Sequence, residues 1–498
     1  MVKIFSKIEV FLMANFIVEF PLKTEIYQED ILNKRFEIGR QIYNSLVHIT
    51  QKRYPEMIKT KNYRKLMASL TGNKKIDKEI WKQIHNIRKQ YRFSEYSFQE
   101  DVKALQKHFK EHIDSSTAQK IATKLWTAYE DLFFGDGKKI WYKKYGEFHS
   151  LEGKSNATGI RFRENHILWN GLRIPVLIEE NNPYEKEALQ SKICYNRIVR
   201  KYVRNKYKFY VQIVFQGNPP IKTDKKTKER KHNIGCGDVG LDIGTSTLAI
   251  VSETKVKLLE LADRVQSIEA QKQKLCRKMD RSRRAMNANN YNEDGTIKKD
   301  RNKKLEWKKS KHYKKYQNQL KEYYRKEAAI RKYQHESLAN EVLVLGNKIY
   351  REKMNFKGLQ RRAKKTEKRE NGKFQSKKRF GKSFGNKAPS MFLTILNRKL
   401  KYYGEELIEI NTYKARASQF NHIEESYKKK KLWERWSEVG GVRVQRDLYS
   451  AFLIQNIGED LESFDMEKCR ERFEKFKELH DKEVERLRGK KNLRSMGI

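Results

Sequence analysis

The segment from Val239 to Val251 constrains this chain most, because it reads as a strand, a tight turn and a second strand with one carboxylate inside the first apolar run. That carboxylate belongs to Asp242, which stands between Leu241 and Ile243. Burying a carboxylate among aliphatic side chains costs free energy unless a metal ion or another cation compensates its charge. The segment therefore predicts a sheet that carries a charged group for a chemical reason.

The 498-residue chain is strongly basic, with 110 Lys and Arg against 63 Asp and Glu and a formal net charge of +47. Such an excess predicts a polyanionic partner, whose binding releases counterions and weakens steeply with salt. Aromatic residues are interleaved with basic ones, for example over 88–93 and 195–204. This pairing suits stacking on bases together with contacts to phosphate. The composition favours a nucleic-acid-binding protein.

The four cysteines form no CxxC pair, so neither a disulfide framework nor a cysteine zinc site is expected. No apolar run reaches the length of a membrane span. We therefore expect a protein of the reducing cytoplasm with no membrane partner. The cysteines lie far apart, at Cys194, Cys236, Cys276 and Cys469.

Residue patterns divide the chain into several structural units, as its length requires. A strand-like run at 14–20 precedes a helical pattern over 26–134, and strand-like runs return between 139 and 216. This order predicts a small β-barrel that is interrupted by a helical insertion. After a basic linker, the chain is expected to be helical and basic over 256–345 and to form a basic loop over 357–387.

Three carboxylates stand out by their context. Asp242 lies in the first strand of a predicted hairpin, Glu352 ends a later strand, and Asp447 opens a helix. Each has an ordinary structural explanation: a turn acid for Asp242, pairing with Arg351 or Lys353 for Glu352, and interaction with the helix dipole for Asp447. Their order and contexts together carry the functional hypothesis.

A strand Asp, a strand Glu and a helix Asp, separated by long insertions, form the layout of ribonuclease H-like nucleases. Phosphodiester hydrolysis at such sites uses two divalent cations roughly 4 Å apart. Hard cations such as Mg²⁺ prefer oxygen ligands. Carboxylates from three separate chain segments can converge on such a pair only if a sheet and a helix bring them together.

Local motifs make the resemblance more specific. The segments GLDIG at 240–244, IYRE at 349–352 and QRDLYSA at 445–451 resemble the three RuvC motifs of miniature type V CRISPR effectors and of their transposon-encoded relatives, the TnpB nucleases. Residues 383–390 resemble the segment near the active-site lid, and 413–419 resemble the lead-in to the target-nucleic-acid-binding module. The chain is most similar to the compact type V-F effectors, over nearly its whole length.

The resemblance implies a multidomain α+β fold in which a helical recognition lobe is inserted in a β-barrel wedge domain and a split ribonuclease H-like (RuvC) domain follows. The implied boundaries are 1–25 and 135–218 for the wedge, 26–134 for the recognition domain, 219–233 for a basic linker, 234–413 and 441–498 for the nuclease with a basic helical segment at 256–345, and 414–440 for the target-nucleic-acid-binding module.

The implied activity is that of an RNA-guided DNA endonuclease of a prokaryotic antiviral defence system, with guide RNA and target double-stranded DNA as partners and a short adjacent motif read by the protein. Asp242, Glu352 and Asp447 would be the catalytic residues and the ligands of two Mg²⁺ or Mn²⁺ ions. Family members often act as two copies on one guide RNA, so a homodimer is an expected option. Expected nucleic-acid contacts are Arg361, Arg362, Lys364, Lys365, Arg379, Lys382 and Arg446.

One departure from the family concerns the module at 414–440. Many relatives carry a zinc ribbon there with two cysteine pairs, whereas this chain has no cysteine in the module, and His422 alone cannot complete a tetrahedral site. We therefore predict a zinc-free module held together by the packing of Phe420, Trp433 and Trp436.

Three other interpretations compete with this one. Actin-like ATPases and sugar kinases share the fold and an Asp-Ile-Gly-Thr-Ser loop, but the chain lacks their second Asp-x-Gly-Gly loop and its charge is unusual for a metabolite kinase. A non-catalytic RNA-binding protein would explain the charge but not the three acids. A TnpB-type nuclease with a transposon-derived RNA is separated poorly from a CRISPR effector by sequence alone.

Overall fold

The computed structural model describes residues 15–73, 75–135, 137–224, 226–227, 229–298, 305–363, 365, 367, 370–372, 380–431, 433–489 and 496–498. The chain divides into two compact units, Met1–Ile221 and Lys222–Ile498. The division falls close to the start of the predicted linker. The finer domain boundaries stay predictions.

The first unit is built on an antiparallel four-stranded sheet in the order β1-β7-β6-β2. A three-stranded sheet, β3-β4-β5, follows β2 in the chain, and the bridge between Leu22 and Val176 joins its end to the end of β1. The predicted turn at Asn170 and Gly171 connects β4 and β5, and both residues have the positive φ of a type I′ turn. The strands are β1 (Asn15–Pro21), β2 (Ser150–Glu152), β3 (Arg161–Arg163), β4 (His166–Trp169), β5 (Leu172–Pro175), β6 (Ile193–Val203) and β7 (Lys206–Gln216).

Five helices lie between β1 and β2 in the chain, as the helical pattern over 26–134 predicts. Helix α2 buries Ile38, Ile42 and Leu46 at the spacing of one helix face. Asp114 and Ser94 cap α6 and α5 by accepting hydrogen bonds from backbone N–H groups in the first turn. The short helix after β5, α7 (Pro183–Gln190), is not among the predicted elements. The helices are α2 (Ile26–Lys59), α3 (Lys61–Ala68), α4 (Lys78–Gln90), α5 (Glu95–His108) and α6 (Ser115–Phe134).

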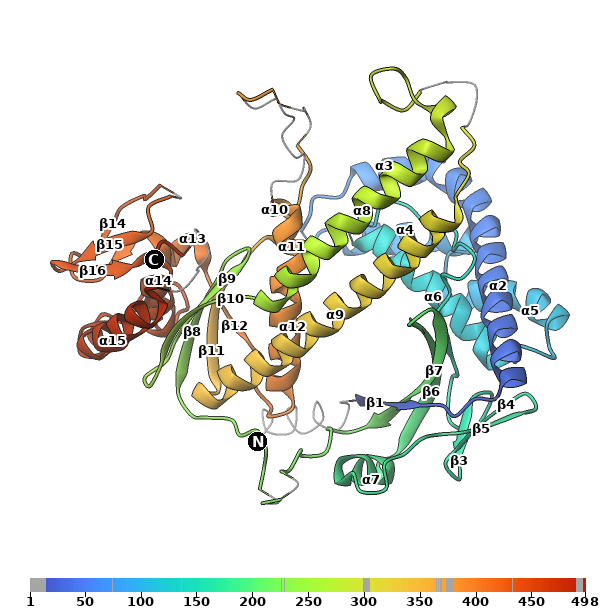
Figure 1. The fold of residues 1–498 in the computed structure, drawn as a ribbon, viewed down its shortest axis with the longest axis horizontal. Helices are drawn as coiled ribbons and strands as arrows, with labels where there is room; N and C mark the ends of the chain where they lie inside the picture. The colour runs from blue at the N-terminus through green and yellow to red at the C-terminus, as the bar shows by residue number, and fades with distance from the viewer. Residues whose placement is uncertain are drawn as a thin grey trace. The chain divides into compact units, whose positions relative to one another are not determined.

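The second unit contains a five-stranded sheet in the order β10-β9-β8-β11-β12. Strands β8, β9 and β10 form an antiparallel meander, and β11 and β12 run parallel to β8. Figure 1 shows helices α9 and α12 on one side of this sheet and α14 and α15 on the other. The elements are β8 (Asp238–Ile243), β9 (Thr247–Val251), β10 (Val256–Glu260), β11 (Lys348–Glu352), β12 (Ile408–Ile410), α9 (Lys311–Leu345), α12 (Pro389–Lys401), α14 (Arg446–Gln455) and α15 (Met466–Leu487).

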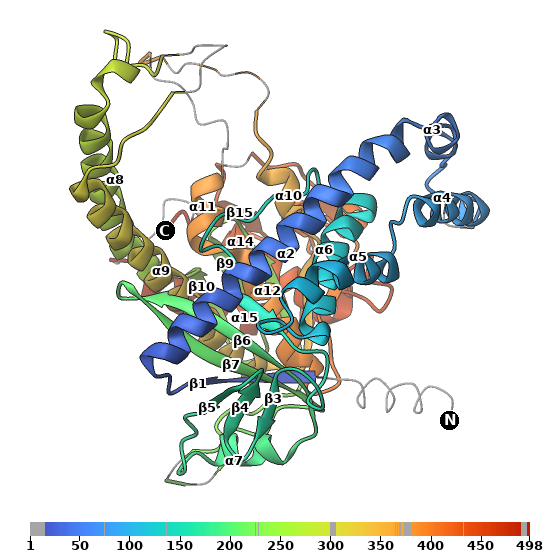
Figure 2. The ribbon, with the colours of Figure 1, turned by 90° about the vertical axis from the view of Figure 1, so that its right-hand side faces the viewer.

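The expectation of helix over 256–345 is wrong at its start. Residues 256–260 form β10, because Val256 and Leu258 alternate inward and pair with β9 across a tight turn. The rest of the segment forms two helices, α8 (Gln266–Met286) and α9, which lie side by side (Figures 1 and 2). The expected loop at 357–387 also contains helical turns, α10 (Phe356–Leu359) and α11 (Gly381–Lys387).

The segment 414–440 holds short elements rather than a single compact domain. Phe420 is buried and stacks on Phe464, and the indole N–H of Trp436 donates to the carbonyl of Gly497. Trp433 is 71% exposed, so its predicted packing role is wrong. The elements are α13 (Thr412–Ala415), β13 (Phe420–Asn421), β14 (Ser426–Tyr427), β15 (Trp436–Val439) and β16 (Val442–Gln445).

None of the helices in the described part of the chain combines the length and the apolar character needed to cross a membrane.

Gly240 allows α14 to lie directly on β8. A Cβ atom at this position would stand 2.0 Å from the carbonyl oxygen of Ala451 and 2.5 Å from the backbone nitrogen of Gln455. Both neighbours are backbone atoms of α14, so no side-chain rotation can make room. The replacement Gly240→Ala must displace the helix.

We expect Gly240→Ala to destabilise the second unit by about 3 kcal/mol or more, the upper part of the range for overpacked cores. The matched control is Gly385→Ala in α11, where a Cβ would meet nothing within 4 Å and alanine is the better helix former. Thermal unfolding of the two variants checks this. Equal melting temperatures would mean that α14 does not pack on β8 at Gly240.

Candidate active site

Asp242 and Glu352 lie on neighbouring parallel strands. The register of β8 and β11 pairs Tyr350 with Gly240 and Arg351 with Leu241, so one further step places Glu352 beside Asp242. Side chains alternate between the two faces of a strand, and Leu241 packs with α9 and α12. Asp242 and Glu352 therefore face the side that α14 covers.

Helix α14 runs antiparallel to β8 and delivers Asp447 to the same place. At its C-terminal end, the side chain of Gln455 donates to the carbonyl of Asp238. The helix rises about 12 Å over the eight residues back to Asp447, and the strand rises about 13 Å over the four residues from Asp238 to Asp242. The matching lengths bring Asp447 level with Asp242.

The electrostatics of Asp242 show that the three predicted acids are neighbours. Burial raises the pKa of Asp242 well above its ordinary value, and the charges of Asp447 and Glu352 raise it further. Arg446 and Arg435 act in the opposite direction. Burial also raises the pKa of Glu352, while a hydrogen bond from the backbone N–H of Ala417 lowers it. The acids share one low-dielectric site, where they repel one another.

Two arginines hold the third acid. Arg446 Nη2 lies 3.3 Å from Asp447 Oδ1, and Arg435 Nη1 lies 3.7 Å from Asp447 Oδ2. The other guanidinium nitrogen of Arg446, Nη1, donates to the carbonyls of Lys431 and Glu434. Sequence reasoning missed Arg435, because nothing in its local pattern separates it from the other basic residues of the segment.

The donor chemistry of the site fits divalent metal ions such as Mg²⁺. Three carboxylates supply hard oxygen ligands, and their mutual repulsion is the kind of destabilisation that a cation relieves. In the described part of the chain, no three His, Cys, Asp or Glu side chains are arranged as a set that would hold a metal ion. The ion pairs between Asp447 and the two arginines are the contacts with which such an ion would compete.

Gln445 caps the helix that carries Asp447. Its side-chain oxygen accepts a hydrogen bond from the N–H of Leu448, and its amide nitrogen donates to the carbonyl of Met496. Its backbone N–H donates to Nε2 of His480, whose Nδ1 contacts the Asp481 carboxylate. These bonds fix the first turn of α14. Sequence reasoning missed this cap, because glutamine is not among the residues that are favoured at the N-cap position.

His422 fixes α14 from the segment 414–440. Its backbone N–H donates to the hydroxyl of Tyr449, and its Nδ1 lies 2.7 Å from the same oxygen. The hydroxyl of Tyr449 thus holds both the backbone and the ring of His422. The ring packs against Phe452 and Phe473. His422 serves as a packing residue here, and the absence of zinc stays a prediction.

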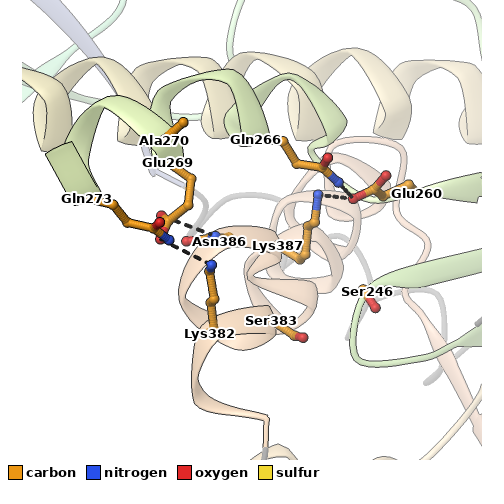
Figure 3. A pocket seen from close by; sticks show the side chains of 10 residues that line it. All are labelled: Ser246, Glu260, Gln266, Glu269, Ala270, Gln273, Lys382, Ser383, Asn386 and Lys387. Atoms are coloured by element: carbon orange, nitrogen blue, oxygen red, sulfur yellow. Dashed lines mark hydrogen bonds and ion pairs between the residues drawn. The ribbon is translucent and has the colours of Figure 1, made fainter. Parts of the chain in front are cut away.

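A pocket of about 660 Å³ borders the turn that follows Asp242 (Figure 3). Ser246 lines it on one side, and α8 and α11 line it on the other. Its two lysines are paired with acids of the same pocket, Lys387 with Glu260 and Lys382 with Glu269. Because its charges compensate one another, the pocket offers no net cation to a phosphate.

The predicted nucleic-acid contacts that the structure describes lie on three different segments. Arg361, Arg362 and Lys365 are exposed on the segment after α10, and Lys382 faces the pocket. Arg446 instead points into the site, where it contacts Asp447. Lys364 and Arg379 lie outside the described residues.

Comparisons with known proteins give the following. No protein-family model matches the chain, and no curated protein matches it. The solved structures that are similar to it include the following two. The first, described as the Cryo-EM structure of the Cas12f1-sgRNA-target DNA complex, has a TM-score of 0.40 at 9% identity and covers 89% of this chain and 99% of its own. The second, the Cryo-EM structure of CRISPR-Cas12f Ternary Complex, has a TM-score of 0.23 at 12% identity, with coverages of 87% and 86%.

The electrostatics predict opposite effects on stability for two of the acids. In EDTA, Asp242→Asn should raise the melting temperature of the second unit by a few degrees, because it removes a buried charge that two neighbours repel. Asp447→Asn should lower it, because it leaves Arg435 and Arg446 without their counter-charge. Calorimetry with and without Mg²⁺ measures both. Destabilisation by Asp242→Asn in EDTA would identify Asp242 as a structural acid.

Lowering the pH should reduce the folding stability of the second unit through protonation of His422. Burial, with Arg470 nearby, lowers the pKa of His422 to about 4, below an unfolded value of about 6.5. The unfolded chain therefore binds the proton more readily, and stability falls as the pH drops below about 6.5, by about 2 kcal/mol at pH 5.

The variant His422→Phe keeps a ring in the aromatic cluster and removes this titration, so its melting temperature should fall less between pH 7 and pH 5. His312→Phe on the exposed surface of α9 is the control and should follow the wild type. A steeper pH dependence in His422→Phe would contradict the assignment.

Proposed function

We propose that this protein is an RNA-guided DNA endonuclease with one active site, formed by Asp242, Glu352 and Asp447. The observation that carries the proposal is the convergence of three carboxylates, from segments more than 90 residues apart along the chain, inside a protein of net charge +47. If Glu352 and Asp447 lay in unrelated places, their charges would not raise the pKa of Asp242. A basic chain that collects acids at one point supports chemistry on a polyanion.

Asp242, Glu352 and Asp447 would hold two divalent ions, which when bound supply an activated water and stabilise the departing 3′-oxygen. The remaining work falls to the protein. The β8–β11 pair and α14 set the spacing of the acids, and the hydrogen bonds of Gln445 keep the first turn of α14 in place. Arg435 and Arg446 are the cations beside the acids, and they would orient a phosphate of the bound strand.

Specificity would come from base pairing with a guide RNA and from a short motif in the adjacent duplex. The Cas12f1 complex contains an sgRNA and a target DNA, and the three motifs lead us to expect the same two kinds of partner for this chain. A homodimer on one guide RNA stays part of the proposal. A TnpB-type nuclease with a transposon-derived RNA has the same chemistry, and the identity of the co-purifying RNA separates the two.

The decisive experiment purifies the protein with its RNA and measures cleavage of double-stranded DNA that matches the guide. We expect cutting with Mg²⁺ and none with EDTA. Asp242→Ala should reduce cutting by at least about 10³-fold while the RNA stays bound. Asp238→Asn is the matched control: it lies at the start of the same strand and contacts Tyr350 and Arg472, so it should keep cutting.

Undiminished cutting by Asp242→Ala would refute the assigned site. A protein that binds RNA but never cuts DNA would be the non-catalytic RNA-binding alternative. A preparation that carries no RNA would contradict guide dependence.

A further inference from the structure

The segment 138–146, which we call the strap, exposes aromatic side chains in the first unit. It contains three aromatic residues and four lysines within nine positions, and it forms no helix or strand. Trp141 is 67% exposed, Tyr142 46% and Tyr145 82%. Exposed rings in such density call for an explanation, since single exposed apolar residues are ordinary but clusters mark binding surfaces.

Hydrogen bonds from α2 hold the backbone of the strap. The side chain of Gln51 donates to the carbonyl of Ile140, and Asn44 both donates to the carbonyl of Lys143 and accepts from its N–H. The N–H of Gly146 donates to the carboxylate of Glu37. The three residues of α2 are seven positions apart, so they form one stripe along the helix.

The strap runs along α2 in the opposite direction and ends in a turn. Its contacts follow the helix backward, from Ile140 at Gln51 to Lys143 at Asn44 and Gly146 at Glu37. The helix rises about 21 Å over the fourteen residues between Glu37 and Gln51. The turn closes the end of the strap, where the N–H of Glu147 donates to the carbonyl of Lys144. The buried side chains of Ile140 and Phe148 anchor its two ends.

This arrangement presents aromatic rings on a backbone that is already ordered. Side chains of α2 form hydrogen bonds with the strap backbone at Ile140, Lys143 and Gly146. The exposed side chains of the strap are therefore the groups that remain to contact a ligand. A pre-ordered segment loses less conformational entropy on binding than a free loop. One lysine already contacts a strap ring, since Nζ of Lys139 lies over Trp141, 4.7 Å from the ring centre.

Alternating rings and lysines match unpaired nucleotides, whose bases stack while their phosphates meet ammonium groups. In a duplex the bases are already stacked on each other and must be flipped out to reach a protein ring. Of the partners in the proposed function, the RNA is the one that offers loops and ends without pairing. A membrane surface fits less well, because lysines flank the rings instead of standing apart from an apolar face.

We propose that the strap is a stacking site for unpaired nucleotides of the bound RNA, with Trp141 and Tyr145 as the stacking side chains. The inference rests on the proposed function only for the source of the RNA. It does not depend on DNA cleavage, so it can fail or hold independently of the nuclease assignment.

The first test compares Trp141→Ala/Tyr145→Ala with the control Tyr96→Ala/Tyr333→Ala, which removes two rings of similar exposure elsewhere. Full-length protein freed of RNA is titrated with a fluorescent single-stranded RNA of mixed sequence. The strap variant should bind about 10- to 100-fold more weakly, at an unchanged slope of log K against log salt. Phenylalanine at both positions should restore most of the affinity.

Lysine variants separate charge from stacking. Lys138→Ala/Lys144→Ala should lower the salt slope by about 0.7 for each phosphate that the protein no longer neutralises. An equal loss of RNA affinity in the control pair, or an equal loss for fully duplex RNA, would overturn the stacking assignment. Anionic vesicles that bind the wild type and not the strap variant would assign the strap to a membrane surface instead.

The second test locates the site on the RNA. Chemical probing of the co-purified RNA should show a small, discrete set of unpaired nucleotides that are protected by the wild type and become reactive in Trp141→Ala/Tyr145→Ala. If no nucleotide changes while binding of single-stranded DNA by the RNA-loaded protein falls, the strap belongs to DNA and the assignment to RNA is wrong.

Discussion

The close approach of α14 to β8 is the constraint on which the candidate active site depends. Only a glycine at position 240 lets the backbone of the helix reach the backbone of the strand. This packing sets the helix antiparallel to the strand, and the matched rises of the two elements then place Asp447 beside Asp242. Gly240 and Asp242 lie on the same face of β8. Gly240 allows α14 to come close to the strand, and this close packing brings Asp447 to Asp242.

Repulsion among the three acids destabilises the folded site, and the neighbouring arginines and hydrogen bonds reduce this destabilisation. Asp242 is crowded by like charge, whereas Asp447 is balanced by Arg435 and Arg446. Hydrogen bonds from Gln445, His480 and Tyr449 then hold the helix where the acids would otherwise push it away. Removing one partner of such a set leaves an unpaired buried charge, and this is why substitutions at neighbouring residues have opposite signs.

Sequence patterns predict strands and helices, because the residues that form each element are adjacent in the chain. They do not predict contacts between residues that only the fold brings together. The three acids could be predicted because Asp242 lies in a recognisable strand, Glu352 ends another and Asp447 opens a helix. The register of the two parallel strands then places the first two acids side by side. Strand β10 was missed because it is only five residues long, contains Lys257 and Glu260, and lies close to a long basic helix. Arg435 was missed because its role depends on Asp447, and the exposure of Trp433 because tryptophan is usually packed.

The strap illustrates the same limit in the first unit. Its composition alone shows lysines beside aromatic residues, a pattern that recurs along this chain and does not select one segment. What distinguishes 138–146 is that α2 holds it by residues seven positions apart, so that its rings are displayed instead of being folded inward. If the two proposals hold, each unit carries its own kind of contact with nucleic acid. The first would offer ordered rings for bases, and the second would offer acids and arginines for a phosphodiester. The two can be measured apart, since stacking is almost insensitive to salt and phosphate contacts are not.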